Sequence, residues 1–337
     1  MSVGRLELYR HLRRVRLLDE RLVLLQRQGR VAFHGSCAGQ EVAPVAAALA
    51  LRPSDWIFPA LRESYAMLVR GYPLARYLAQ DFGTSLDPSR GRQMPSHQSA
   101  RSVNVVSWSS CIATQLPHAV GMALAAKQRG RDDVSLAFMG DGATSHPDFH
   151  AALNFAAVMR APCVFVCQNN QFAISLPVER QSGNPRLFEK AAAYGIPGER
   201  VDGNDAELVI DVIERAAARA RSGGGPSFIE CLTYRMGPHS SSDDPSRYRD
   251  EAATRAWAER DPVTLVQSRL FAAGALDHAA DDDLTRELTR ELDLAVEAAE
   301  AAPPPPVSSL LDDVYAELPW HLREQADELA RRVERER

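Results

Sequence analysis

Val134-Ser-Leu-Ala-Phe-Met139 is a mainly apolar run in the centre of the chain, and it ends at Gly140-Asp-Gly142. Cys163-Val-Phe-Val-Cys167 is a second apolar run, ending at Gln168-Asn-Asn-Gln171. Between them, Pro147 suits the first position of a helix that continues to Met159. A strand, a helix and a strand of these lengths form a βαβ unit, which requires a parallel sheet covered by helices.

The same pattern recurs further along the chain. A short strand near Val201 is followed by Asn204-Asp205, which we expect to cap a helix reaching Arg221. Gly223-Gly-Gly-Pro226 ends that helix, and Ser227–Tyr234 reads as another strand. The sequence therefore predicts an α/β fold with a doubly wound, mainly parallel sheet flanked by helices.

Helical extensions are expected on both sides of this sheet. Apolar residues from Leu8 to Leu25 recur at steps of three and four, as in an amphipathic helix, and acidic residues interrupt its Arg-rich start. We read that helix as part of the fold and not as a targeting segment. The expected divisions are a helical extension over residues 1–60, a central α/β domain over 61–250, and a helical extension over 251–337 with a Pro-rich linker at 303–306.

Composition excludes several classes of function. The 337 residues include 39 basic and 44 acidic side chains, a net charge of −5, so no global field favours nucleic acid or an anionic membrane. The longest apolar stretch, 42–51, is about half of what a spanning helix needs. Five cysteines, an odd number without zinc-like spacing, argue against a disulfide framework and favour a reducing cytoplasm.

Two polar segments follow the predicted central strands. Carboxyl ends of parallel strands meet at one edge of a sheet, so Asp141 and Asn170 should face one crevice. Their carboxylate and amide oxygens, with a loop carbonyl, would form half of a Mg²⁺ shell that substrate phosphates and water complete. Gly140 and Gly142 would let the backbone approach a diphosphate, and the helix beginning near Pro147 would direct its positive end toward it.

A third polar segment contains His239. Gly237 and Pro238 fix the backbone before it at a predicted strand end, where the ring could bind a phosphate or move a proton. A flexible polar surface loop is the alternative interpretation. We do not expect zinc at His146 and His150, because no Glu follows the first His and Pro147 places it at or before the helix start.

These motifs resemble the α subunit of the decarboxylating component of 2-oxo acid dehydrogenase complexes, above all the bacterial branched-chain type. The matching segments run nearly from end to end: GQE at Gly39–Glu41, RQMPSH at Arg92–His97, SSCIATQLPHAVG at Ser109–Gly121, GDGATSHPDFHAALNFA at Gly140–Ala156, NNQFAIS at Asn169–Ser175, RVDGND at Arg200–Asp205, TYRMGPHSSSDDPSRYR at Thr233–Arg249 and DVYAELPWHLR at Asp313–Arg323.

The resemblance implies a site for thiamine diphosphate and Mg²⁺. The implied Mg²⁺ ligands are Asp141, Asn170 and the carbonyl of Phe172. The implied cofactor contacts come from several segments: Arg62, Ser110, Gly142, Ala143 and His239. His239 is also implied to assist acyl transfer.

Further roles follow from the same resemblance. A K⁺ site is implied at Ser109, Thr114, Gln115 and the carbonyl of Cys111. Docking of a lipoyl-bearing domain is implied for Arg235, Asp243 and Tyr248. Ser240 matches a position that is phosphorylated in mitochondrial relatives, a regulation we do not expect in a bacterial-looking chain.

Two departures concern the diphosphate. Leu61 stands where relatives often have Tyr, and Gln168 replaces an Arg of the mitochondrial branched-chain enzyme. More of the basic side of the site would then depend on Arg62. We therefore expect weaker cofactor binding than in those relatives.

The implied reaction is thiamine-diphosphate-dependent decarboxylation of a branched-chain 2-oxo acid with reductive acylation of a lipoyl group. The family supplies a further carboxylate from a β subunit, which implies an α₂β₂ heterotetramer in a multienzyme complex. Two alternatives stay open. One is a pyruvate or acetoin dehydrogenase α subunit, and the other is a non-catalytic Mg²⁺–diphosphate-binding protein.

Overall fold

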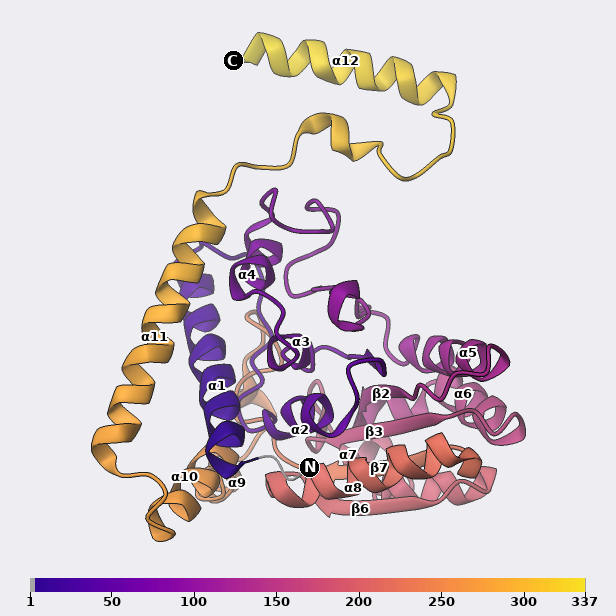
Figure 1. Ribbon diagram of the computed structural model, residues 1–337. Coiled ribbons are helices and arrows are strands. Elements are labelled where there is room, and N and C mark those ends of the chain that lie inside the picture. Colours follow the sequence, from indigo (N-terminus) through magenta and orange to yellow (C-terminus); the bar gives the residue numbers. More distant parts are fainter. Residues whose placement is uncertain (1–3, 337) are drawn as a thin grey trace.

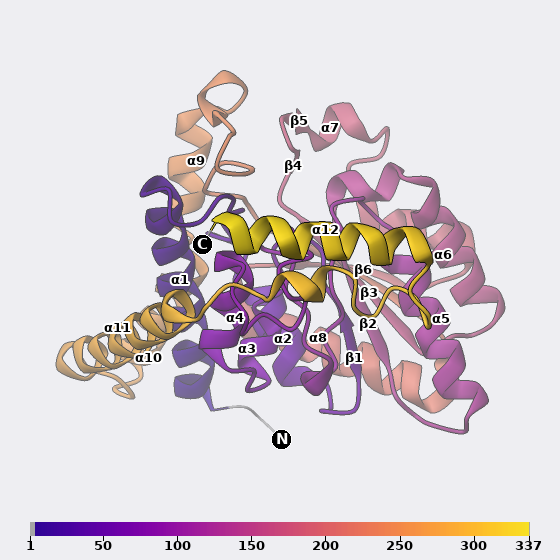
Figure 2. The same cartoon turned by 90° about the horizontal axis from the view of Figure 1, so that it is seen from above.

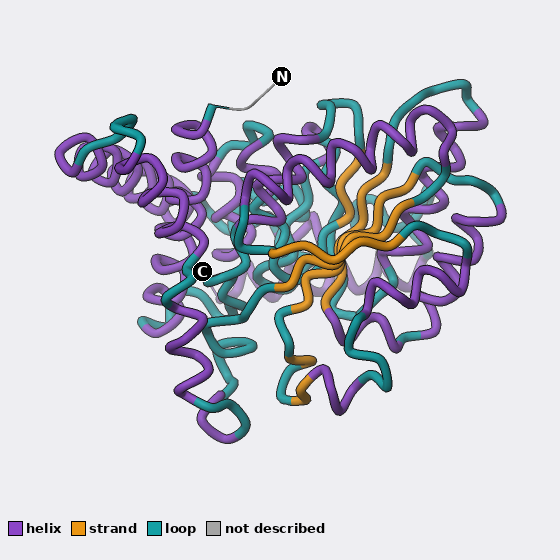
Figure 3. Tube along the Cα trace, turned by 90° about the horizontal axis from the view of Figure 1, so that it is seen from below, coloured by secondary structure: helices purple, strands orange, loops and turns teal. Residues whose placement is uncertain are grey.

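A five-stranded parallel sheet forms the centre of the molecule in the computed structural model, which describes residues 4–336. The strand order is β1-β2-β3-β7-β6. Their bounds are Trp56–Phe58 for β1, Ser135–Gly140 for β2, Cys163–Asn169 for β3, Gly198–Asp202 for β6 and Ser227–Leu232 for β7. This confirms the predicted doubly wound α/β class, and Figure 3 shows the twisted strands with helices on both sides.

Alternating side chains of the central strands feed two separate cores. Leu136 and Phe138 of β2 are buried in one apolar cluster, while Ala137 and Met139 point to the other. Successive side chains of a strand point to opposite faces of the sheet, which produces this division. Phe165 of β3 is also fully buried. Truncating such a ring to Ala lowers the free energy of unfolding by about 3–5 kcal/mol, which shows how much a single core side chain contributes to stability.

Helices cover each face of the sheet. One face carries α5 and α6, and the opposite face carries α2 and α8 (Figure 1). Their bounds are Gln115–Gln128 for α5, Pro147–Val158 for α6, Val42–Ala50 for α2 and Ala206–Arg219 for α8. Because β1 is in the sheet and α2 covers it, part of residues 1–60 belongs to the same core as the central segment.

The N-terminal helix α1, Arg5–Arg27, buries the predicted apolar stripe from Leu8 to Leu25. It packs beside α10 and α11 (Figure 1). The remaining elements are short or lie outside the sheet: α3 Ala66–Val69, α4 Leu74–Phe82, β4 Phe172–Ala173, β5 Leu176–Pro177, α7 Val178–Gln181, α9 Glu251–Ala258, α10 Pro262–Ala272, α11 His278–Ala301 and α12 Trp320–Glu336.

The C-terminal segment leaves the body of the molecule. Residues 303–306 join α11 to a short 3-10 turn, and Pro303 accepts a backbone hydrogen bond from Ser85. Helix α12 then stands apart from the rest of the chain and crosses above it (Figures 1 and 2). Within residues 4–336, no helix combines the length and apolar character needed to cross a membrane.

The cysteines are free thiols. Cys163 and Cys167 lie on one buried face of β3, as the spacing predicts, and Cys37 and Cys231 are also buried. Burial raises the pKa of these four thiols, which keeps them protonated and unreactive. Cys111 is exposed.

Candidate active site

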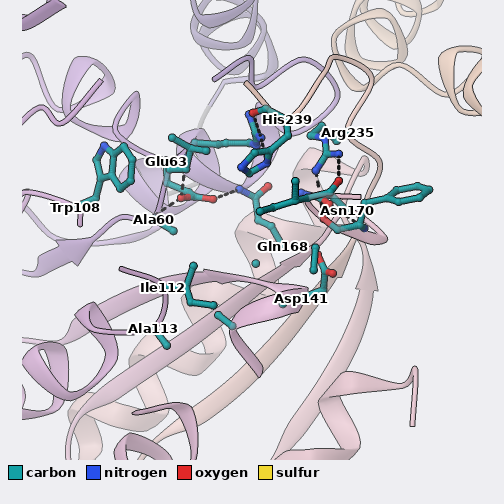
Figure 4. A pocket seen from close by; sticks show the side chains of 18 of the residues that line it. Ala60, Glu63, Trp108, Ile112, Ala113, Asp141, Gln168, Asn170, Arg235 and His239 are labelled. Carbon is teal, nitrogen blue, oxygen red and sulfur yellow. Dashed lines mark hydrogen bonds between the residues drawn. The ribbon is translucent and has the colours of Figure 1, made fainter. Parts of the chain in front are cut away.

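A cavity of about 440 Å³ opens at the carboxyl ends of β2 and β3. The register pairs Gly140 with Gln168, so the residues that follow both strands meet at one edge of the sheet, as predicted. In Figure 4, Asp141 and Asn170 lie close together at this edge. The size suits a small-molecule ligand, for which pockets of about 300–1,000 Å³ are usual.

Asp141 follows β2 directly and opens a 3-10 turn, Asp141–Ser145, that leads into α6. Its side chain is 1% exposed, and its Oδ2 has no hydrogen-bond partner within the described chain. Burial raises the pKa of Asp141 to about 6. A buried, unpartnered carboxylate oxygen is unfavourable alone, and a bound cation would remove that cost.

Gly142 and Ala143 line the cavity from the same turn. A Cβ added at Gly142 would lie 2.8 Å from the Cβ of Ala173, so no larger residue fits between this turn and the β4–β5 hairpin. Gly142 therefore lets the hairpin close over the turn. Both residues lie at the part of the cavity where the resemblance places a diphosphate.

Asn170 lies one residue beyond β3 and is also buried. Its Oδ1 accepts a hydrogen bond from the backbone N–H of Phe172 at 3.2 Å, and its Nδ2 donates to Oε1 of Gln40 at 2.8 Å. The carbonyl of Phe172 accepts one from Nη1 of Arg235 at 3.2 Å. The three predicted Mg²⁺ ligands thus line one cavity, and their oxygen donors fit that hard cation.

Arg62 and His239 form the opposite wall. Nη2 of Arg62 donates to the carbonyl of His239 at 2.8 Å and lies 3.4 Å from its Nδ1, while Nη1 donates to the carbonyl of Ser36. Burial, with the nearby charges of Arg62 and Arg235, lowers the pKa of His239 to about 4. The ring is therefore neutral at pH 7, and its Nδ1 accepts from Arg62, which leaves the proton on Nε2.

The segment after β7 holds this histidine in place. Asp243 accepts hydrogen bonds from the backbone N–H of His239, at 2.6 Å, and from the hydroxyl of Tyr248. Arg235 donates to Tyr248 at 3.0 Å and to the carbonyl of Ile174 at 2.6 Å. Arg235 is only 1% exposed, so the structure places it in the cavity wall, and its part in partner docking stays a prediction.

Ser240 is 8% exposed, and its Oγ lies 3.2 Å from Oγ of Ser242.

The two histidines at which we do not expect zinc have separate partners. Nδ1 of His146 accepts from the N–H of Asp148 as the N-cap of α6, and Nδ1 of His150 contacts the hydroxyl of Tyr194.

The predicted K⁺ segment, residues 109–115, forms a tight turn before α5. Thr114 Oγ1 donates to the carbonyl of Cys111 at 2.9 Å, and Ser109 Oγ accepts from the N–H of Cys111 at 3.2 Å. Ala113 has a φ of 66°, a left-handed conformation that costs energy for any residue with a Cβ. Gln115 donates to the carbonyl of Phe138 at 2.7 Å. K⁺ binding by this turn stays a prediction.

Ser110 belongs to the same turn and contacts a residue with no predicted role. Its Oγ lies 2.8 Å from Nε2 of His97, whose ring stacks on Trp108 at 3.9 Å between centroids. Nδ1 of His97 lies 3.1 Å from the carbonyl of Pro95. A carbonyl can only accept, so Nδ1 of His97 carries a proton.

The two departures from the family pattern both lie in the cavity wall. Gln168 donates to Oε1 of Glu63, a link drawn in Figure 4. Glu63 also accepts from the backbone N–H groups of Ala60 and Arg62, and burial raises its pKa. Leu61 offers only carbon atoms.

Several lining residues have no role that the sequence predicts. Gln40 and Glu63 are buried polar groups of the wall, and Ile112 and Ile174, each 56% exposed, stand at the cavity mouth. Gln40 lies in the GQE motif. That motif indicates the family but does not show that Gln40 lies in the cavity wall. The others carry no local pattern, since only the fold brings them to the cavity.

Comparison with known proteins assigns this chain to a family. Residues 9–308 match the family described as "Dehydrogenase E1 component".

Three relatives represent bacteria and animals. The 3-methyl-2-oxobutanoate dehydrogenase subunit alpha of Mycobacterium tuberculosis is 43% identical over 93% of this chain and 83% of its own. The 2-oxoisovalerate dehydrogenase subunit alpha of Bacillus subtilis is 38% identical over 92% and 94%, respectively. The human mitochondrial 2-oxoisovalerate dehydrogenase subunit alpha is 38% identical over 98% and 74%.

Proposed function

Because this chain belongs to the dehydrogenase E1 component family, we propose that it is the α subunit of a branched-chain 2-oxo acid dehydrogenase. Bacterial and eukaryotic relatives with that activity in their names align with most of the chain. The observation that carries the proposal is the unpartnered Oδ2 of Asp141, buried beside Asn170 in a cavity at the strand ends. This carboxylate oxygen is the kind of ligand that the Mg²⁺ of a Mg²⁺–diphosphate group requires there.

E1 dehydrogenases use thiamine diphosphate. In this chain Asp141, Asn170 and the carbonyl of Phe172 would hold Mg²⁺, and the N–H groups of Gly142 and Ala143 would bind the diphosphate. When bound, the cofactor supplies the electron sink for decarboxylation of a 2-oxo acid. The residues of this chain supply binding and electrostatics.

Arg62 and His239 would act on the charged groups that enter the cavity. The guanidinium of Arg62 stays protonated, although burial beside Arg235 lowers its pKa to about 10. It would bind a phosphate oxygen and keep the His239 ring oriented. The neutral ring lines the cavity, and its Nε2–H would donate to a phosphate or a developing oxyanion during acyl transfer.

The assembly completes the proposal. Ile112 and Ile174 leave an apolar rim exposed around the cavity mouth, which suits coverage by a β subunit in an α₂β₂ heterotetramer. A lipoyl domain of the acyltransferase component would then accept the acyl group, with Arg235, Asp243 and Tyr248 shaping the segment it approaches. Residues 109–115 would bind K⁺, Ser110 would contact the cofactor, and the complex would work in the cytoplasm.

The test uses the purified chain alone and the chain co-purified with its β subunit. We expect thiamine diphosphate with Mg²⁺ to bind tightly to the complex, and decarboxylation of 3-methyl-2-oxobutanoate to require both subunits. Full-rate decarboxylation by the single chain would disprove the need for a β subunit. A complex that binds the cofactor but turns over no 2-oxo acid would point to the non-catalytic alternative.

A further inference from the structure

Gln40 is fixed in the cavity wall by a turn that joins two distant parts of the chain. Its N–H donates to the carbonyl of Cys37 at 2.7 Å, and Thr233 Oγ1, just beyond β7, donates to the carbonyl of Gly39 at 2.6 Å. Gly39 has a φ of +86°, and a Cβ there would lie 2.4 Å from the carbonyl oxygen of Tyr234. Only glycine allows this close approach, so the backbone position of Gln40 is tied to the end of the sheet.

The orientation of two side-chain amides follows from one backbone donor. The N–H of Phe172 can only donate, so the Asn170 atom that it contacts is the oxygen Oδ1. Nδ2 of Asn170 must then be the atom that faces Gln40 at 2.8 Å, and the Gln40 atom there must be the acceptor Oε1. These assignments use both atoms of the Asn170 amide and Oε1 of Gln40, and they leave Nε2 of Gln40 without a contact in this pair.

That Nε2 has no hydrogen-bond partner within the described chain, although Gln40 is only 2% exposed. An unmet buried donor costs about 1–3 kcal/mol, so native proteins seldom keep one without a use. Gln40 lines the same cavity as Asp141, whose Oδ2 is an unmet acceptor. One unmet N–H donor and one unmet carboxylate oxygen in the same cavity match a ligand that combines a cation with an anion.

We propose that Gln40 is a positioning residue for the metal site and a donor to the diphosphate. Its Oε1 holds the Asn170 amide so that Oδ1, with a free lone pair, faces the metal, and its Nε2 binds an anionic oxygen of the diphosphate. The inference rests on the proposed function, because it assigns a part in the Mg²⁺–diphosphate site. Such outer partners of metal ligands affect metal affinity about 10- to 100-fold.

Two variants of the full chain, each co-purified with the β subunit, separate the two roles. Gln40→Met has a similar length and removes both the acceptor and the donor. Gln40→Glu keeps an acceptor for Asn170 but replaces the donor by a carboxylate. Gln267→Met is the matched control, since Gln267 donates to Asp281 at 2.7 Å on α10 and lies outside the cavity.

The probes are Mn²⁺ alone, followed by electron paramagnetic resonance, and inorganic diphosphate at saturating Mn²⁺, followed by calorimetry. For Q40M we expect both dissociation constants to rise about 10-fold or more, with Q267M unchanged. For Q40E we expect Mn²⁺ affinity to be kept and diphosphate affinity to fall by at least about 10-fold. Melting curves of all four proteins check that folding is intact.

Each contrary result has a definite meaning. An unchanged Mn²⁺ dissociation constant in Q40M overturns the positioning role, and unchanged diphosphate binding in both Gln40 variants overturns the donor role. In either case the proposed function stands if the unmodified complex binds both probes. If the unmodified complex binds neither, the proposed cofactor site itself fails.

Discussion

Nη2 of Arg62 lies 3.4 Å from Nδ1 of His239 and donates to the carbonyl of the same residue at 2.8 Å. One guanidinium therefore fixes both the backbone and the ring of the histidine. The positive charge also disfavours the imidazolium, in addition to the effect of burial. This contact determines the protonation state with which His239 meets a ligand.

We predict that His239 of the cofactor-free protein titrates with a pKa of about 4. Since this value is below the ordinary 6.5, folding favours the neutral ring, and the associated loss of stability develops as the pH falls from 6.5 toward 4. Nitrogen-15 histidine NMR measures the titration, with His239→Gln to assign the signal. In Arg62→Met the pKa should move upward, and an unchanged value would show that Arg62 has no electrostatic effect on the ring.

Asp141 should give the opposite linkage. Burial raises its pKa to about 6, so the ionised form destabilises the fold above that pH, and this cost disappears as the pH falls below it. Metal affinity measured by calorimetry should therefore drop below pH 6. Asp141→Asn should abolish metal binding yet raise the melting temperature of the cofactor-free protein by about 2 °C. The half-buried Asp148, which does not line the cavity, provides the control, and binding that survives in D141N would exclude Asp141 as a ligand.

Gln168 should limit affinity for thiamine diphosphate. Its amide donates to the buried carboxyl of Glu63, whereas an arginine there would pair with Glu63 and also present a charge to the diphosphate. We expect Gln168→Arg to tighten cofactor binding about 10-fold by calorimetry, equivalent to about 1.4 kcal/mol. Leu61→Tyr tests the second departure separately. If neither change tightens binding, the expectation of a weakened basic wall is wrong.

His239→Ala should slow acyl transfer to a lipoyl domain by about 100-fold, because the Nε2–H donor is lost. The dissociation constant of the cofactor is measured in parallel. A raised constant would indicate a lost binding contact, and an unchanged one would indicate a lost contribution to the chemical step. Ser242→Ala, in the same loop, is the control. Full activity of H239A would favour the non-catalytic alternative.

Local sequence patterns predicted the sheet and half of the site. The β2 and β3 runs, Pro147 at the first position of α6 and the Asp205 cap of α8 are short-range signals, and all are present in the structure. The strand Trp56–Phe58 was not predicted, since three residues next to Pro59 are too few to show a period. Helix α5 was also missed.

The rest of the site depends on contacts between distant segments. Gln40 and Asn170 are 130 residues apart, and Gln168 and Glu63 are 105 apart. No pattern within one segment could show that these amides and carboxylates meet. The burial of Arg235 likewise follows from its place behind the β4–β5 hairpin and not from its neighbours in sequence.

Substrate preference of the assembled enzyme is the most direct test of the whole account. With the α and β subunits, thiamine diphosphate, Mg²⁺ and a lipoyl domain, kcat/KM for 3-methyl-2-oxobutanoate should exceed that for pyruvate and for acetoin by about 10-fold or more, since an apolar pocket gains at least that from added methyl groups. A preference for pyruvate or acetoin would contradict the branched-chain assignment.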